Sequence, residues 1–250
     1  MASRIEAEEP DSWEDLENKA TRILVEAGFA AERGKSVESV RGTVTVDVYS
    51  EDDSVNPPVV TLFECKYWTR PVPQTVVHAF RTVVIDTGAN AGLIVSKSGF
   101  QSGANNAASF SNVKLIGWDE FQDLHADRWY RNYMMPTGWA ALSPLISYVE
   151  HFNSRIFRKA DALSDIAQQQ FKALRDKHHR ALDLAPLFFG FPIGLGGPQL
   201  PPDLPMRDSF SGYFPGDLLG ANSLRGLLDA VIRYAESTTQ LFDDVFGERA

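Results

Sequence analysis

The sequence is poor in cysteine, in long apolar runs and in positive charge, and each shortage excludes a class of protein. Cys65 is the only cysteine among 250 residues, which excludes an intrachain disulfide. No apolar run approaches ~20 residues and no basic-then-apolar segment opens the chain, so we expect no membrane span, no secretory signal and a cytoplasmic location. With 33 acidic against 24 basic residues, we do not expect a protein that coats nucleic acid non-specifically; a local basic groove is compatible with this balance.

The sequence does contain enough apolar material for a core, since 44% of its residues are hydrophobic and 11% aromatic. A chain of this length forms one large domain or a domain with an appendage. Its pattern changes near residue 134, from strands alternating with helices to a purely helical periodicity. We therefore expect a frayed acidic terminus over residues 1–10, a first domain over residues 11–133 and a helical region over residues 134–250.

The run from Thr61 to Trp68 reads as a buried strand, yet it carries two charged side chains, Glu64 and Lys66. Alternation along a strand places these two side chains on one face and Cys65 on the other. Ionised groups are seldom buried unless they are paired or bind a metal, because desolvating them costs free energy. A surface ion pair on an edge strand is the alternative interpretation.

A second strand of alternating β-branched residues, Val44 to Tyr49, has Asp47 in its middle. A charged loop with two prolines, residues 50–58, separates it from the strand that contains Glu64. The simplest pairing of the two strands is a hairpin, which can bring Asp47 beside Glu64 and Lys66. Two carboxylates near one ammonium can hold a hard divalent cation and leave a lysine to orient water.

Together with their neighbours, these motifs resemble the Mrr-like branch of the PD-(D/E)xK restriction-endonuclease superfamily over roughly residues 13–121. The further matching pieces are a first helix with Glu17 and an Ala27-Gly28-Phe29 ending, a helix that begins at Gln74, the strand 91–96, and Gly99-Phe100-Gln101 before an Ala-rich helix. The resemblance implies that residues 11–133 are a nuclease-like domain with Mg²⁺-dependent phosphodiesterase activity, in which Mn²⁺ can substitute.

The resemblance also implies roles for individual residues. Asp47 and Glu64, with the Cys65 carbonyl, would hold Mg²⁺, and Lys66 would orient or activate the attacking water. Glu17 would support the metal through a bound water; a solvated helix carboxylate is the alternative interpretation of this residue. Gln74, at the start of its helix, is expected near the scissile phosphate.

We expect contacts with double-stranded DNA from two parts of the chain. Arg70 lies in a proline-containing turn after the Glu64 strand, and Lys97 precedes a helix whose first N–H groups favour phosphate; an ordinary connecting turn is the alternative there. In the helical region, basic residues including Arg158 and Lys159 form the best candidate for a DNA-facing surface in an acidic chain, although a solvated helix face is the blander explanation. His178 and His179 are adjacent and cannot chelate one ion from a helix.

Strands alternating with helices after a hairpin predict an α/β sandwich with a mixed central sheet, followed by a helical region. This agrees with the restriction-endonuclease-like fold that the resemblance implies. Within the first domain, a strand begins at 29–33, a link follows at 34–40, and Asp119 caps a helix that starts there. Beyond it, Pro136, Gly138 and Pro144 mark a connection before one long helical segment at 145–182. A Gly/Pro-rich loop at 185–221 precedes a last helix capped by Asn222 or Ser223.

The sequence thus predicts a Mg²⁺-dependent DNA endonuclease in restriction or anti-phage defence, acting as a homodimer or with a partner subunit. Two alternatives remain open. An inactive nuclease-like domain could serve as a binding or sensor module, with Glu64 and Lys66 paired structurally. The sequence also does not exclude an RNA-directed nuclease, because the catalytic residues act on the phosphate that both polymers share.

Overall fold

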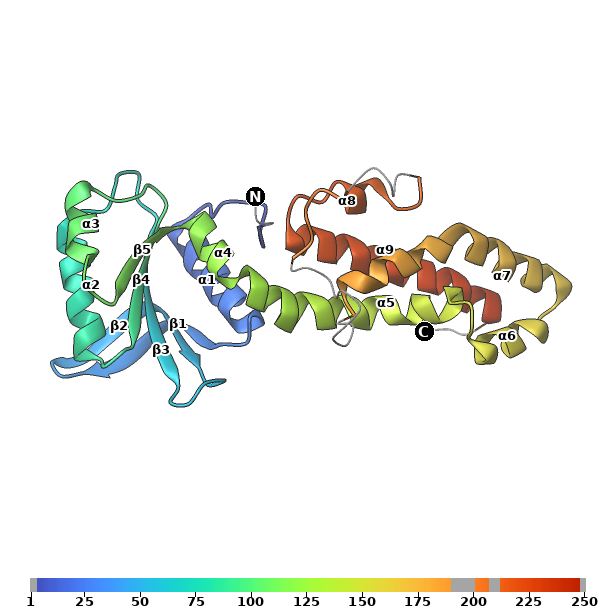
Figure 1. Ribbon diagram of the computed structural model, residues 1–250, viewed down its shortest axis with the longest axis horizontal. Coiled ribbons are helices and arrows are strands. Elements are labelled where there is room, and N and C mark those ends of the chain that lie inside the picture. Colours follow the sequence, from blue (N-terminus) through green and yellow to red (C-terminus); the bar gives the residue numbers. More distant parts are fainter. Residues whose placement is uncertain (1–3, 190–200, 207–211, 248–250) are drawn as a thin grey trace. The chain divides into compact units, whose positions relative to one another are not determined.

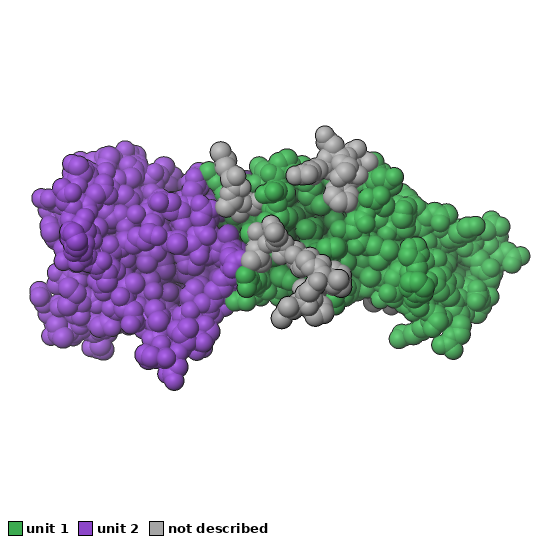
Figure 2. Space-filling model, viewed as in Figure 1, with its two compact units in different colours: residues 1–7, 130–250 green, residues 8–129 purple. Residues whose placement is uncertain are grey.

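The computed structural model describes residues 4–189, 201–206 and 212–247. The chain divides into two compact units: residues 8–129, and residues 1–7 together with residues 130–250 (Figure 2). The helices in the described part of the chain are all too short or too polar to cross a membrane. Residues 190–200 and 207–211 of the predicted Gly/Pro-rich loop at 185–221 lie outside the described residues.

The unit of residues 8–129 is built on a five-stranded sheet whose order follows the sequence. The strands β1, β2 and β3 pair antiparallel, and β3, β4 and β5 pair parallel, so the predicted mixed sheet is confirmed. The bounds are β1 Ala30–Ser39, β2 Gly42–Asp52, β3 Val59–Lys66, β4 Ala91–Ser96 and β5 Val113–Gly117. The antiparallel half contains the predicted hairpin, and the parallel half brings three strand ends to one edge.

Helices cover both faces of this sheet, α1 and α4 on one face and α2 and α3 on the other (Figure 1). Their bounds are α1 Trp13–Glu26, α2 Gln74–Asp86, α3 Ser102–Ala108 and α4 Trp118–Trp129. Ser12 caps α1 by accepting a hydrogen bond from the Asp15 N–H. The apolar side of α2, with Phe80 and Val84, packs on Leu62 and Ile94 of the sheet. The α/β sandwich is therefore held by an apolar layer on each side.

Two local predictions in this unit are wrong. Residues 34–40 do not link two strands, because β1 continues to Ser39. Gly34 permits this with a backbone φ of +64°, which a side chain would disfavour. Helix α4 begins at Trp118, so Asp119 lies in its first turn and does not cap it. Instead, the Glu120 carboxylate accepts a hydrogen bond from the Gly117 N–H at 2.9 Å, which satisfies a donor at the helix start.

The other unit is helical, as expected, but its segmentation differs from the prediction. The helices are α5 Met135–Val149, α6 Ser154–Asp161, α7 Asp165–His178, α8 Gly216–Leu219 and α9 Leu224–Phe246, with short η1 Tyr130–Met134 and η2 His179–Leu187. Asn153 and Ser164 cap α6 and α7, which divides the predicted long segment. The predicted connection lies within α5, because Pro136 occupies its first turn, where a missing N–H is tolerated, and Gly138 is buried under Phe188.

The first described residues belong to this helical unit, and residues 4–7 are not frayed. Ile5 is fully buried, and the Leu224 N–H donates to the Arg4 carbonyl at 2.8 Å. The Arg225 Nε lies 2.8 Å from Glu6 Oε1, and both side chains are largely buried. Ser223 caps α9 beside this contact, as one of the two predicted residues. Apolar burial and an ion pair thus fix a segment whose acidic composition suggested disorder.

Candidate active site

The hairpin of β2 and β3 positions the predicted charged residues. These strands pair with Val48 opposite Phe63, and the same register continued by one residue places Asp47 opposite Glu64. The Asp47 Oδ2 accepts a hydrogen bond from the Cys65 N–H at 2.7 Å. A side-chain carboxylate therefore takes the place of a backbone acceptor at the end of the ladder, which holds Asp47 close to β3.

Lys66 lies between the two carboxylates. Its Nζ is 2.5 Å from Glu64 Oε1 and 3.9 Å from Asp47 Oδ2. The three side chains are partly buried, with 16% of Lys66, 25% of Glu64 and 29% of Asp47 exposed. The structure thus brings together the three residues that the alternation of the strands predicted to meet. We call Asp47, Glu64 and Lys66 the charged cluster.

The electrostatics of the charged cluster disfavour a second negative charge. Burial raises the pKa of Glu64, and the nearby Asp47 carboxylate raises it further, while Lys66 opposes both effects. A divalent cation between the carboxylates would favour the ionised form, and protons would be released as it binds. The Cys65 thiol lies buried, and burial raises its pKa well above the ordinary value, so it is neutral at physiological pH.

Glu17 lies near the charged cluster, but it is held by a residue that the sequence did not single out. Its carboxylate is 8% exposed and accepts a hydrogen bond from the Arg33 Nε at 2.7 Å. The Arg33 Nη1 also donates to Asn18 Oδ1, and its pairing with Glu17 raises the pKa of Arg33. The alternative of a solvated carboxylate is therefore wrong. The sequence shows a cation at position 33, beside the Asp47 strand. Because a link is predicted from Gly34 onward, the sequence does not predict the strand register that brings Arg33 to Glu17.

The outer predicted residues lie near the edge where β3 and β4 end. Gln74 is the first residue of α2, and its side chain lies over Gly103 of α3, where an added Cβ would be 2.9 Å from its Oε1. The Lys97 N–H donates to the Lys66 carbonyl at 3.1 Å, and Arg70 is exposed in the turn after β3. Lys97 is therefore joined to Lys66 through the backbone, and neither Lys97 nor Arg70 has a side-chain hydrogen bond or ion pair with the charged cluster among those described.

Arg158 and Lys159 belong to the helical unit, on the exposed side of α6. Another arginine of the predicted basic surface has a structural role: Arg175 donates to the carbonyls of Tyr148, Val149 and Glu150, at the end of α5. It satisfies carbonyls that a helix end leaves open. At least one basic residue of this segment, Arg175, therefore joins α7 to the end of α5.

The donor set fits a magnesium ion with a mostly aqueous shell. In the part of the chain that the structure describes, no three His, Cys, Asp or Glu side chains converge as a metal-binding group. Asp47 and Glu64 provide two hard oxygen donors, and Mg²⁺ in proteins is commonly bound through one or two carboxylates with several waters. The pKa of Glu64 is raised first by burial and then by the Asp47 carboxylate, and a bound cation would oppose both effects.

Part of the chain is similar to a known protein family, and two solved structures resemble it weakly. Residues 11–125 match the family model Mrr_cat, described as a restriction endonuclease. No curated protein matches the chain. A crystal structure described as a protein of unknown function is 14% identical, with 95% of this chain and 100% of that chain covered and a TM-score of 0.38. A repair endonuclease from Pyrococcus abyssi is 21% identical, with 45% of this chain and 50% of that chain covered and a TM-score of 0.32.

Proposed function

We propose, from the match of residues 11–125 to the restriction endonuclease family model, that this chain is a metal-dependent endonuclease that hydrolyses phosphodiester bonds of double-stranded DNA. We place its role in restriction or anti-phage defence in the cytoplasm, as a homodimer or with a partner subunit. The observation that carries the proposal is the charged cluster itself. A fold gains little stability from two partly buried carboxylates that share one ammonium, so binding chemistry is the better explanation for them.

Each member of the charged cluster has a distinct role in this proposal. Asp47 and Glu64, with the Cys65 carbonyl, would hold Mg²⁺, for which Mn²⁺ can substitute; when bound, the ion polarises the phosphate and lowers the pKa of water. The Lys66 ammonium orients the attacking water and stabilises negative charge that develops on the phosphate. No covalent nucleophile is required, which is consistent with the buried, neutral Cys65 thiol.

Two further residues support the cluster from a distance. Glu17, which is held by Arg33, would orient a water bound to the metal. Gln74, at the start of α2, can donate its amide to the phosphate or the leaving group. Lys97, Arg70, Arg158 and Lys159 would contact the DNA backbone.

The test is nicking and linearisation of a supercoiled plasmid by the full chain, with Mg²⁺, Mn²⁺ or EDTA. We expect metal-dependent cleavage that Lys66→Ala reduces by about 10²–10⁴-fold, because charge stabilisation in the transition state is lost. Lys114→Ala is the matched control, since Lys114 is an exposed lysine of β5. Equal cleavage by wild type and Lys66→Ala would contradict the proposal, and calorimetry without any Mg²⁺ or Mn²⁺ binding would favour the inactive module.

The polymer is tested separately with DNA and RNA strands of the same sequence. We expect cleavage of the DNA duplex and much slower cleavage of the RNA. Faster cleavage of the RNA would support the role of the charged cluster in phosphodiester hydrolysis but would show that the substrate is RNA.

A further inference from the structure

An exposed tryptophan lies beside the charged cluster. All five tryptophans belong to the described part of the chain, and Trp13 and Trp68 are the exposed ones, with 55% and 37% of their surface accessible. A large, rigid aromatic ring is common where proteins contact a partner, because it offers a wide contact area at little cost in side-chain entropy. The surroundings of Trp68 indicate which partner it fits.

Trp68 shares a face with two members of the charged cluster. The alternation that places Glu64 and Lys66 on one face of β3 continues to Trp68, two residues further along the chain. The Lys66 Nζ lies 5.7 Å from the centroid of the Trp68 ring, near the ~6 Å limit of cation–π contact. The ammonium therefore lies next to the indole, while more than a third of the residue remains open to a ligand.

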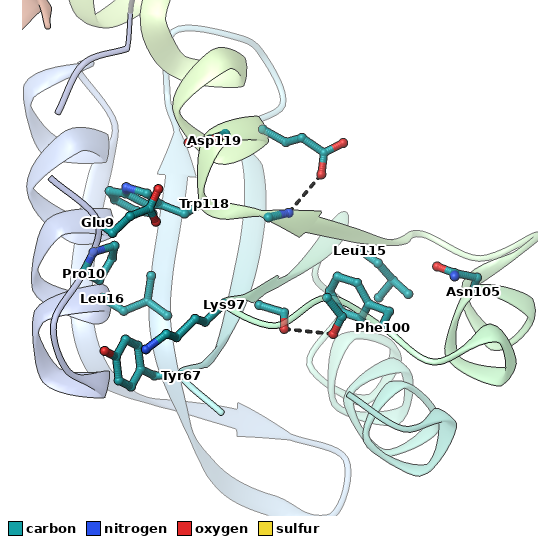
Figure 3. Close-up of a pocket in the computed structure, with 14 residues that line it drawn as sticks. Glu9, Pro10, Leu16, Tyr67, Lys97, Phe100, Asn105, Leu115, Trp118 and Asp119 are labelled. Atoms are coloured by element: carbon teal, nitrogen blue, oxygen red, sulfur yellow. Dashed lines mark hydrogen bonds between the residues drawn. The ribbon is translucent and has the colours of Figure 1, made fainter. Parts of the chain in front are cut away.

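The neighbouring aromatic residue, Tyr67, belongs to a separate cavity of about 730 Å³, which Trp118 and Lys97 also line (Figure 3). The Lys97 Nζ lies 3.8 Å from the centroid of the Tyr67 ring, and the ring of Trp118 stacks on that of Phe121 with centroids 5.3 Å apart. No member of the charged cluster is among the described residues that line this cavity. Of these two rings and that of Trp68, only Trp68 is exposed beside the charged cluster.

The backbone that carries Trp68 is fixed by hydrogen bonds to the turn after β4. The Trp68 carbonyl accepts a hydrogen bond from the Ser98 Oγ at 2.6 Å. The Val72 N–H donates to the Gly99 carbonyl at 2.9 Å, the Gln101 N–H donates to the Val72 carbonyl at 3.0 Å, and Val72 is fully buried. The segment that presents the indole is therefore already ordered, so a ligand that contacts it does not have to order a loop.

The charges near Trp68 favour an anionic chain that also has flat rings. Lys66 contributes an ammonium on the same face, and Arg70, two residues after Trp68, is exposed in the turn. A nucleic acid strand combines negative phosphates with aromatic bases, and bases stack on exposed aromatic side chains regardless of sequence. Within a paired duplex, neighbouring bases cover both faces of each base, so stacking on an indole requires a base step that has opened.

We propose that Trp68 stacks on the nucleobase that adjoins the phosphate bound at the charged cluster, and that the chain binds best where this nucleotide is unpaired. Lys66 and Trp68 are two residues apart, a separation of ~7 Å along a strand that a single nucleotide can span. This inference rests on the proposed nuclease function and adds to it a preference for the structure of the DNA. A fully paired site binds more weakly, because the stacking of that base must first be lost.

The first test measures DNA binding by the full chain in EDTA, where no cleavage occurs. Fluorescence anisotropy compares three labelled duplexes of the same sequence: one fully paired, one with an extra unpaired adenosine, and one with an abasic nucleotide in place of that adenosine. We expect the duplex with the unpaired adenosine to bind about five- to tenfold more tightly than either of the others. Trp68→Ala should abolish the difference between the adenosine and the abasic duplex.

Phe110→Ala is the matched control for this test. Phe110 is a fully exposed aromatic residue of the same unit, and it precedes β5, so it lies at the opposite edge of the parallel strands from Trp68. Its loss should leave all three affinities unchanged. Equal affinity of the wild type for the adenosine and abasic duplexes, or an undiminished difference in Trp68→Ala, would overturn the proposal.

Cleavage kinetics with Mg²⁺ separate contact with the base from an effect through Lys66. Stacking that is equal in the bound state and the transition state contributes to KM. Trp68→Ala should therefore raise KM for the adenosine duplex about five- to tenfold with kcat unchanged, and Trp68→Phe, which keeps a ring, should restore much of the loss. A fall in kcat with KM unchanged would overturn the proposal, because it would show that Trp68 acts by holding the Lys66 ammonium.

The binding test and the cleavage test fail separately. Absence of cleavage by the wild type, together with tight binding of the unpaired adenosine, would contradict the proposed nuclease function and support the stacking role of Trp68. Cleavage that Lys66→Ala abolishes, together with equal binding of the adenosine and abasic duplexes, would support the nuclease and overturn the role of Trp68.

Discussion

Two acidic groups on the same hairpin strand, five residues apart, have opposite electrostatic surroundings. Asp52 accepts hydrogen bonds from both terminal nitrogens of Arg128, and this pairing holds the pKa of Asp52 well below its usual range. Asp47 shares a lysine with Glu64, and burial together with Asp47 raises the pKa of Glu64. The Asp52–Arg128 pair stabilises the fold, whereas in the charged cluster a bound cation would stabilise the ionised form of Glu64.

The surroundings of Arg128 show how complete the compensation is in the first region. Its Nε donates to the Ala27 carbonyl at 2.9 Å, and its guanidinium lies 3.9 Å from the ring centroid of Phe29. One side chain therefore joins the end of α1, the hairpin and α4. No comparable clamp fixes Lys66, whose described ion pairs are only those with the two carboxylates.

The sharpest way to break this comparison is to neutralise each aspartate separately. We expect Asp47→Asn to reduce plasmid cleavage by about 10²–10⁴-fold, because the charge is lost while an oxygen remains to accept from the Cys65 N–H. Asp52→Asn should lower stability and leave the cleavage rate nearly unchanged at a temperature where it is folded. A large rate loss in Asp52→Asn, with folding shown by circular dichroism, would contradict the division of roles.

The next largest effect concerns stability. Arg128→Met should lower the free energy of unfolding by about 2 kcal/mol, because Asp52 and two carbonyls lose their donor in a partly buried place. Arg41→Met, which removes an ion pair between a mostly exposed arginine and Asp86, is the control and should cost at most ~1 kcal/mol. Urea unfolding of the full chain measures both, with hydrogen exchange of α1 and α4 peptides to locate the change. Equal losses would show that Arg128 is no special clamp.

Substitution of Glu64 is expected to increase the free energy of unfolding, by less than Arg128→Met lowers it. Because its pKa is raised in the fold, the unfolded chain ionises this carboxyl first, and stability falls as the pH rises through the folded pKa. In EDTA, Glu64→Gln should therefore increase stability by up to ~1 kcal/mol near pH 7.5 and by almost nothing near pH 4. Asp52 has the opposite pH dependence: because its pKa is lowered in the fold, its contribution to stability is lost as the pH falls below the usual pKa of an aspartate. Thermal unfolding across pH, with and without Mg²⁺, measures this, and a destabilised Glu64→Gln at neutral pH would contradict it.

The smallest expected effect sharpens the role of Arg33. This cation pairs with Glu17 and lies close enough to Asp47 for their charges to interact. We expect Arg33→Gln to bind Mg²⁺ a few-fold more tightly, since a nearby positive charge is removed, while the cleavage rate at saturating metal falls because Glu17 is less well held. Calorimetry and cleavage at high Mg²⁺ separate the two effects. Weaker Mg²⁺ binding would show that the position of Glu17 matters more than the charge of Arg33.

Local signals in the sequence predicted much of this unit. Helix α2 and strand β4 have the predicted bounds, because Pro71 and Pro73 precede the helix and Thr87-Gly88 end it. The convergence of Asp47, Glu64 and Lys66 followed from alternation and a short loop, which together constrain the pairing of a hairpin. These are short-range regularities, and each holds regardless of what the rest of the chain does.

What the sequence could not predict depends on packing between distant segments. Arg128 contacts residues 76 and 101 positions away, and no local pattern indicates such partners. The cavity at Trp118 requires residues from α1, β5 and the turn after β3 to meet at one edge. In the helical unit, the sequence predicts a break at Pro136 and Gly138. Helix α5 accommodates both residues, because Pro136 lies in its first turn and Gly138 packs under the ring of Phe188, and a local pattern indicates neither condition.

The buried contacts of Ile5 and Glu6 have a consequence for modularity. Because residues 4–7 pack with α9, the helical unit is assembled from two separate stretches of the chain, and residues 8–129 form an insertion between them. Replacing that insertion would leave in the chain both stretches that supply the contacts of residues 4–7 with α9. A fragment that starts at Tyr130 would instead lose the apolar residue and the ion pair that complete it.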